Sequence, residues 1–142
     1  MVNRYGVPAG LVLVAFGCGM WLGSARVDAQ RTPRVLEVRR YTANPDKLDA
    51  LLQRMRSGET KLFEKHGMKG VFYSVAADAP DSQNTFIYVL SHESREAAKK
   101  SWEDFRNDPA WKSMRDTSEA AGPLVGKVES TFVVPTDFSP AK

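Results

Sequence analysis

The sequence has 142 residues, which is enough for one ordinary domain and too few for two. Its 42% apolar and 26% charged residues are typical of a folded soluble domain and exclude a disordered chain. The formal net charge is +3, but basic and acidic residues are interleaved. No clustered basic face of the kind that binds nucleic acid is therefore expected.

The first thirty residues differ from the rest of the chain. Arg4 precedes an almost wholly apolar or glycine stretch over residues 7–22, and Val27 and Ala29 supply the two small residues that a signal peptidase reads. This pattern predicts a secretory signal peptide over residues 1–29, cleaved near Ala29. The mature protein would then be exported, either periplasmic or extracellular.

Two alternatives stay open for this N-terminal segment. An uncleaved segment would anchor the chain in a membrane through residues 7–23, although that stretch is shorter than the roughly 20 residues a spanning helix needs. Lipidation of Cys18 would anchor it as a lipoprotein, but Phe16 fits that signal poorly. Cys18 is the only cysteine, so cleavage would leave no disulfide and no thiol nucleophile.

The mature chain begins with a strand pattern and a helix pattern. Alternation over residues 35–41 places Leu36 and Val38 on one face, and the other face carries Glu37, Arg39 and Tyr41. Asn44-Pro45-Asp46 predicts a helix start, because an N-cap residue, a first-turn proline and an acid follow one another. Apolar residues at helical spacing then continue to His66, and Gly67 predicts the stop.

Two more strands, a second helix and a last strand follow. Residues 70–75 and 85–91 are β-rich, and the second of these is expected to be central and most buried. Ser94 predicts the cap of a helix that Asp108-Pro109 breaks and restarts and Gly122-Pro123 ends. A fourth strand is expected over residues 125–134.

The resulting order is βαββαβ, the ferredoxin-like α+β arrangement with a four-stranded antiparallel sheet and both helices on one face. One domain is therefore expected over residues 35–134, between a short linker at 30–34 and a tail at 135–142. The uncovered face is expected to carry Val35, Glu37, Arg39 and Tyr41. This mixed face predicts a homodimer in which two open sheet faces meet to close a barrel.

Four segments resemble the NIPSNAP family in order and spacing. They are Glu37-Val38-Arg39-Arg40-Tyr41-Thr42, Asn44-Pro45-Asp46-Lys47-Leu48, Leu62-Phe63-Glu64-Lys65-His66-Gly67 and Trp102-x-x-Phe105-Arg106-x-Asp108-Pro109-x-Trp111. The resemblance implies a dimeric α+β barrel, in a superfamily that also holds cofactor-free monooxygenases, haem-degrading enzymes and stress-induced barrels. It implies no single reaction, because this fold hosts many functions. The single domain and the predicted signal peptide fit an exported bacterial member.

The first candidate site is the polar face of the first strand. Glu37, Arg39 and Tyr41 share this face and could hold an acidic or phenolic ligand inside the barrel. A cross-strand ion pair with an interface tyrosine explains the same residues without a ligand. Both interpretations stay open.

The histidines form the second candidate. His66 ends the first helix, where it would act as a general base or simply cap terminal carbonyls. The topology places His66 and His92 at one end of the domain, with Glu64 and Glu93 near them in sequence, but no tight metal-ligand motif is present. No metal site is therefore predicted.

The third candidate is the aromatic stripe of the second helix. Trp102, Phe105 and Trp111 share one helix face and form either core packing or a wall of a ligand site. The helix has no histidine over residues 94–121, so axial haem ligation from it is disfavoured, and no cofactor is predicted. No nucleotide fingerprint or serine elbow occurs.

Three functions fit these features. The first is an exported homodimer that binds a small apolar or aromatic molecule, with Glu37, Arg39, Tyr41, Trp102 and Phe105 as candidate ligand-binding residues. The second is a cofactor-independent monooxygenase or isomerase on the same scaffold, with His66, Tyr41 and Tyr73 as candidate catalytic residues. The third is a ligand-free interaction module.

Overall fold

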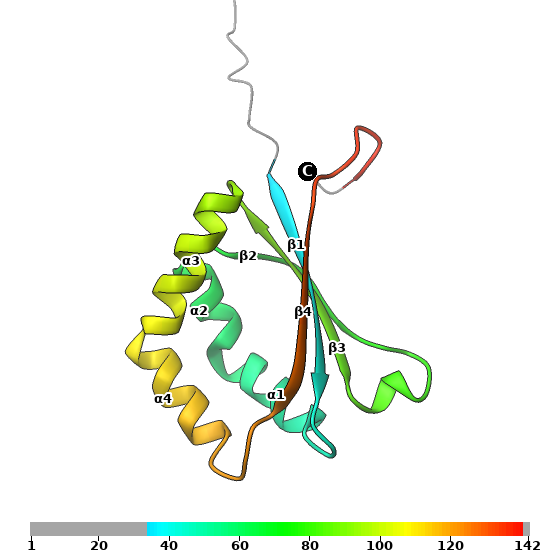
Figure 1. The fold of residues 1–142 in the computed structure, drawn as a ribbon, viewed down its shortest axis with the longest axis vertical. Helices are drawn as coiled ribbons and strands as arrows, with labels where there is room; N and C mark the ends of the chain where they lie inside the picture. The colour runs from blue at the N-terminus through cyan, green and yellow to red at the C-terminus, as the bar shows by residue number, and fades with distance from the viewer. Residues whose placement is uncertain (1–33, 141–142) are drawn as a thin grey trace, which may run out of the picture.

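A computed structural model describes residues 34–140 as a four-stranded sheet with helices on one side (Figure 1). The strands are β1 (Val35–Ala43), β2 (Lys69–Val75), β3 (Thr85–His92) and β4 (Val125–Val133). Their order in the sheet is β2-β3-β1-β4, and every neighbouring pair is antiparallel. The predicted ferredoxin-like α+β fold is therefore confirmed.

The helical segments connect these strands. They are α1 (Leu48–Arg54), the π-helical turn η1 (Met55–Glu59), α2 (Thr60–Lys65), the 3₁₀ turn η2 (Asp81–Gln83), α3 (Arg95–Asn107) and α4 (Pro109–Ser118). Helices α1 to α4 cover one face of the sheet and leave the other uncovered (Figure 1). Within residues 34–140, no helix is long and apolar enough to cross a membrane. The predictions for the signal peptide, Cys18 and residues 30–33 of the linker lie outside the described residues.

Local side-chain chemistry sets most of the helix ends. The Ser94 hydroxyl accepts a hydrogen bond from the backbone N–H of Ala97 at 3.0 Å and so caps α3. A carboxylate oxygen of Asp108 accepts from the backbone N–H of Ala110 at 2.8 Å and caps α4. After α2, Gly67 adopts a φ of +78°, a left-handed conformation that glycine accommodates best. These ends confirm the predicted caps and stop.

The predicted start of the first helix is wrong by several residues. Helix α1 begins at Leu48, and the residue before it, Lys47, caps it without a side-chain hydrogen bond. Asp46 has a φ of +60°, which interrupts any helix that starts at Asn44. The Asn44 amide instead donates to the carbonyl oxygen of Pro123 at 2.8 Å. Asn44 therefore ties the end of β1 to the start of β4.

The face assigned to Glu37, Arg39 and Tyr41 is also wrong. These side chains lie on the helix-covered face, where Trp102 of α3 donates to Glu37, and not on the uncovered face. Successive side chains of a strand point to opposite faces of the sheet. Assigning one residue to the wrong face therefore assigns every other residue of the strand to the wrong face as well. The uncovered face of β1 therefore carries Leu36, Val38, Arg40 and Thr42.

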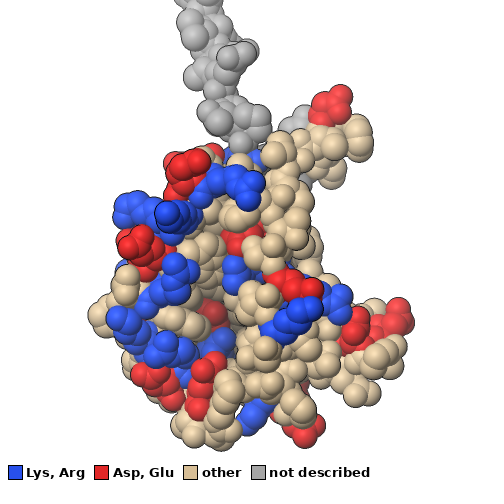
Figure 2. Space-filling view, viewed as in Figure 1, with Lys and Arg blue, Asp and Glu red and all other residues tan. Residues whose placement is uncertain are grey.

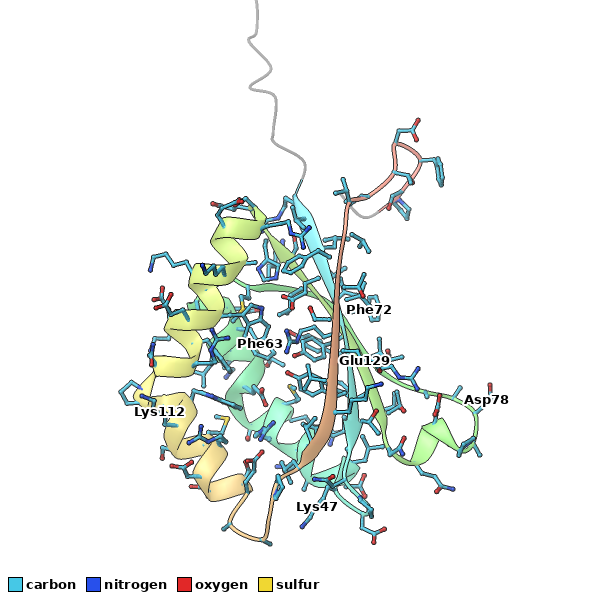
Figure 3. The ribbon with its side chains drawn as sticks, viewed as in Figure 1. Lys47, Phe63, Phe72, Asp78, Lys112 and Glu129 are labelled. Carbon is cyan, nitrogen blue, oxygen red and sulfur yellow. The ribbon has the colours of Figure 1, made fainter. Side chains whose placement is uncertain are left out.

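The core lies between this covered face and the helices. Phe63 of α2 and Tyr88 of β3 are fully buried and stack with ring centroids 5.8 Å apart. Phe105 of α3 packs against Phe63 at 5.1 Å. In Figure 3, Phe63 points between the helices and the sheet, whereas Phe72 lies on the sheet's other side. Strand β3 is central and almost wholly buried, as predicted.

Candidate functional site

A buried carboxylate, Glu37, is the centre of a polar network on the covered face of β1. One carboxylate oxygen accepts from Arg39 Nη1 at 2.6 Å and from the Ser130 hydroxyl at 2.7 Å. The other oxygen lies 2.7 Å from the indole N–H of Trp102 and 3.0 Å from Nε2 of His92. The side chain of Glu37 is only 2% exposed. Donors from β1, β3, α3 and β4 thus converge on one carboxylate.

These donors control the ionisation of Glu37. Burial alone would raise the pKa of this carboxyl group, because burial disfavours its charged form. The hydrogen bonds from His92, Ser130 and Trp102, together with the charge of Arg39, outweigh burial and lower the pKa from 4.5 to about 2. Glu37 is therefore an anion at neutral pH. Since an anionic carboxylate only accepts, Nε2 of His92 carries the shared hydrogen.

We expect the stability of the protein to fall in acid as Glu37 takes up a proton. The pKa of Glu37 is lower in the folded state, so its contribution is complete above pH 4.5 and is lost as pH falls towards about 2. The contribution is on the order of 3 kcal/mol. Urea denaturation across this range would measure it. Glu37→Gln should lack this component, whereas Glu103→Gln, at an exposed position, should retain it.

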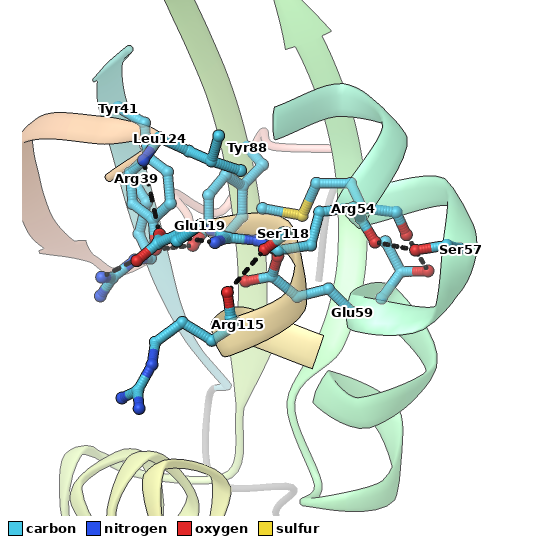
Figure 4. A network of polar contacts seen from close by, with 12 residues as sticks. Arg39, Tyr41, Arg54, Ser57, Glu59, Tyr88, Arg115, Ser118, Glu119 and Leu124 are labelled. Carbon is cyan, nitrogen blue, oxygen red and sulfur yellow. Dashed lines mark hydrogen bonds and ion pairs between the residues drawn. The ribbon is translucent and has the colours of Figure 1, made fainter. Parts of the chain in front are cut away.

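Arg39 connects Glu37 to a pair of tyrosine hydroxyl groups. Its Nη2 donates to the Tyr41 hydroxyl at 3.3 Å, and the Tyr88 hydroxyl donates to the same oxygen at 2.7 Å (Figure 4). Burial, followed by the proximity of Tyr41, raises the pKa of Tyr88, so Tyr88 stays protonated and keeps this donor. The guanidinium carbon of Arg39 also lies 4.2 Å from the ring centroid of Trp102. Arg39 is thereby held between a carboxylate and an aromatic ring.

A cavity of about 280 Å³ opens beside this network, between α3 and β4. It is lined by Glu37, Arg39, Arg95, Lys99, Trp102, Arg106 and Phe132. In the space-filling view, Lys and Arg side chains lie along the α3 side of the hollow next to β4 (Figure 2). Aromatic surface, a buried ion pair and basic side chains at the mouth therefore line one and the same cavity.

His66 does not join this network. Its Nε2 lies 2.7 Å from a carboxylate oxygen of Asp108, which also accepts from Lys65 Nζ at 2.7 Å. Hydrogen bonds from Lys65, His66 and the backbone of Ala110 lower the pKa of Asp108, so Asp108 is ionised. His66 therefore ties the end of α2 to the start of α4, while His92 belongs to the Glu37 network. Among residues 34–140, no three His, Cys, Asp or Glu side chains are grouped as a metal ion requires.

Tyr73 lies at a second cavity, between α1, α2 and the edge strand β2. This cavity of about 640 Å³ is lined largely by apolar groups that include Met55, Tyr73 and Phe86. The Tyr73 ring stacks on Phe86 and Tyr88, with centroids 6.4 and 5.9 Å apart. It covers Gly70, where an added Cβ would clash with the Tyr73 hydroxyl group. Tyr73 is thus separated from Glu37 and lines a different site.

The aromatic stripe has two roles. Trp102 lines the first cavity and donates to Glu37, whereas Phe105 is buried against Phe63 and Trp111 beside the cavity. Of the five predicted ligand-binding residues, the network joins Glu37, Arg39, Tyr41 and Trp102. The sequence analysis missed the contributions of His92 and Ser130 to the network and of Arg95, Lys99, Arg106 and Phe132 to the cavity. The spacing of residues 95, 99, 102 and 106 on one helix face would have indicated three of the lining residues.

Comparison with solved structures finds a similar fold in NIPSNAP proteins of unknown function and in a monooxygenase. A NIPSNAP family protein of unknown function from Agrobacterium tumefaciens has a TM-score of 0.68 at 19% identity, covering 78% of this chain and 96% of that one. An uncharacterized NIPSNAP-like domain protein from Burkholderia xenovorans has a TM-score of 0.66 at 16% identity, covering 77% and 90%. A Streptomyces coelicolor monooxygenase, solved with the ligand Nanaomycin D, has a TM-score of 0.50 at 15% identity, covering 76% and 92%.

The family assignment comes from the amino-acid sequence. The NIPSNAP family profile matches residues 36–140, which is most of the chain. The chain therefore belongs to the NIPSNAP family, as the four sequence segments implied. No curated protein matches the sequence.

Proposed function

We propose that this chain is an exported, homodimeric NIPSNAP protein that binds a small aromatic or apolar molecule in the cavity between α3 and β4. The observation that carries this proposal is the cavity itself. Trp102 and Phe132 give it aromatic walls, and Glu37 holds Trp102 and Arg39 in place by accepting a hydrogen bond from each. Such preorganisation lowers the cost of ordering a site when a ligand binds.

The shared fold is consistent with a ligand-binding role. The Streptomyces coelicolor monooxygenase, which was solved in complex with a small molecule, has a similar fold. Its sequence identity of 15% supports only the scaffold as a place for small molecules and does not extend its reaction to this chain.

The uncovered sheet face supports the homodimer. The register places apolar side chains on that face of all four strands, namely Leu36 and Val38 of β1, Phe72 of β2, Ile87 and Val89 of β3, and Val133 of β4. Phe72 is 48% exposed and Val133 is 37% exposed. A second copy that laid its own uncovered face here would remove this apolar surface from water. The partner surface is thus the face opposite to Glu37.

Native mass spectrometry of the purified protein tests both parts of the proposal. We expect a dimer that carries additional non-protein mass, or that gains it from added aromatic compounds. Val38→Asp puts a charge at the centre of the uncovered face and should give a monomer. Lys112→Asp, on the outer face of α4 (Figure 3), should leave the dimer intact. For the exported form, the mass should correspond to a chain that starts at Gln30.

Other results would contradict the proposal. A wild-type monomer would refute the dimer, and a Val38→Asp dimer would move the interface elsewhere. A dimer that binds none of the added compounds would favour the ligand-free interaction module.

The enzymatic alternative rests on Tyr41. Of the three candidate catalytic residues, only Tyr41 lies in the Glu37 network, where its hydroxyl accepts from both Arg39 and Tyr88. Conversion of a bound compound by the wild type, but not by folded Tyr41→Phe, would favour a cofactor-independent monooxygenase or isomerase.

A further inference from the structure

The cavity between α3 and β4 carries a surplus of positive charge. Four cationic side chains line it, and the one carboxylate that lines it, Glu37, already accepts four hydrogen bonds. The three cations contributed by α3 are Arg95, Lys99 and Arg106. None of these three makes an ion pair with an acidic side chain in residues 34–140.

Two of these cations, Arg95 and Lys99, are placed unfavourably for the helix alone. Arg95 is the first residue of α3, where the positive end of the helix dipole repels a cation. Lys99 follows Arg95 at i,i+4, a spacing at which like charges destabilise a helix. The neighbouring Lys100 is arranged differently, because it pairs with Asp104 at 2.6 Å. Stability of α3 therefore does not account for Arg95 and Lys99 of the basic stripe, whereas Arg106, in the last turn, also suits the helix dipole.

The second cavity, at Tyr73, has no such surplus of positive charge. The cavity at Tyr73 is lined by one arginine, Arg56, and one glutamate, Glu64, so its charges balance. At the first cavity the cations lie beside Trp102 and Phe132, and Arg95 covers the Phe132 ring at 4.7 Å from its centroid. Aromatic walls would take a flat apolar body, and the basic mouth would take an anion.

We infer that the ligand of this cavity is an aromatic carboxylate, with its ring against Trp102 and Phe132 and its acid group between Lys99 and Arg106. This inference rests on the proposed function, because it names the class of molecule that the same cavity binds. Arginine suits the acid group, since its planar fork donates two parallel hydrogen bonds to a carboxylate.

Isothermal titration of the purified protein with a matched pair of compounds tests the inference. The pair is 2-naphthoate and the neutral alcohol 2-naphthalenemethanol, which share a ring system and differ in charge. We expect the carboxylate to bind about tenfold more tightly than the alcohol. Added salt should weaken only the binding of the carboxylate, because it screens exposed charges.

Variants of α3 assign the charge preference to named residues. Lys99→Gln and Arg106→Gln should each weaken naphthoate binding about fivefold and leave binding of the alcohol unchanged. Lys100→Gln is the matched control, because Lys100 is adjacent in sequence but pairs with Asp104 and does not line the cavity. Naphthoate binding should be the same in Lys100→Gln as in the wild type.

The possible failures are distinguishable. Equal affinity for the two compounds, or equal losses in Lys99→Gln and Lys100→Gln, would overturn the charge inference while leaving a small-molecule site in place. Failure of both compounds to bind would overturn the proposed function together with the inference. Binding to phosphatidylglycerol vesicles without any preference for naphthoate would assign the basic stripe to a membrane surface and contradict the inference.

Discussion

Glu37→Leu is expected to lower the free energy of unfolding by about 3–5 kcal/mol, as is typical when one partner of a buried ion pair is removed. The leucine has no acceptor for Arg39, whose side chain is only 14% exposed, or for the indole N–H of Trp102. His92, which is 1% exposed, also loses its partner. The midpoint of urea unfolding, with its slope, would measure this loss.

Two further variants separate the lost ion pair from a general effect of the substitution. Glu103→Leu changes the same residue type at an exposed position of α3, away from the uncovered sheet face, and should change stability little. Glu37→Leu combined with Arg39→Met removes both charges and should be more stable than Glu37→Leu alone. Equal stability of the double and single variants would show that the unpaired guanidinium is not the cause.

Most helix ends and the strand order could be predicted from the sequence because their causes are local, whereas the start of α1 could not. Ser94, Asp108 and Pro109 act on backbone groups one to three residues away, so a short window contains both the cap and the group that it caps. The alternation of β1 was equally visible. These local features were sufficient for the predicted order βαββαβ, which the structure confirms.

The inward face of β1 could not be predicted in this way, because its cause is distant in sequence. Glu37 is buried since Trp102 and Ser130, 65 and 93 residues further along the chain, supply hydrogen bonds to it. Polarity alone favours Leu36 and Val38 as the inward residues, and that choice reversed both faces. The cavity could not be predicted either, because its walls come from β1, α3 and β4, which are far apart in the sequence.

A second buried ion pair lies beneath the helices, around the π-helical turn η1. The side chains of Arg54 and Glu59 are 4% and 2% exposed, and Arg54 Nε donates to Glu59 at 2.8 Å (Figure 4). Arg54 Nη1 also donates to Glu119 at 2.9 Å, and its guanidinium carbon lies 5.0 Å from the Trp111 ring centroid. Arg54 thus connects α1, η1 and the segment after α4.

Arg54→Met is expected to lower the free energy of unfolding at neutral pH by about 3–5 kcal/mol, because it leaves Glu59 buried without a counter-charge. Arg115→Met is the matched control, since Arg115 is exposed and pairs only with the exposed Asp116. Thermal and urea unfolding should show a large loss for Arg54→Met and little change for Arg115→Met. A combined Arg54→Met and Glu59→Gln variant should recover part of the loss.

The pH dependence of the Arg54→Met defect identifies its origin. Burial raises the pKa of Glu59 in the wild type, and the positive charge of Arg54 partly offsets this rise. Removing Arg54 should therefore raise the folded-state pKa of Glu59 further. A raised carboxyl pKa stabilises the fold below the unfolded pKa, and this contribution is lost as pH rises through the folded pKa. The deficit of Arg54→Met relative to the wild type should therefore be smaller in slightly acidic than in slightly alkaline buffer. Glu37 titrates in both proteins and cancels from this difference, so a deficit independent of pH would assign the loss to packing against Trp111 instead.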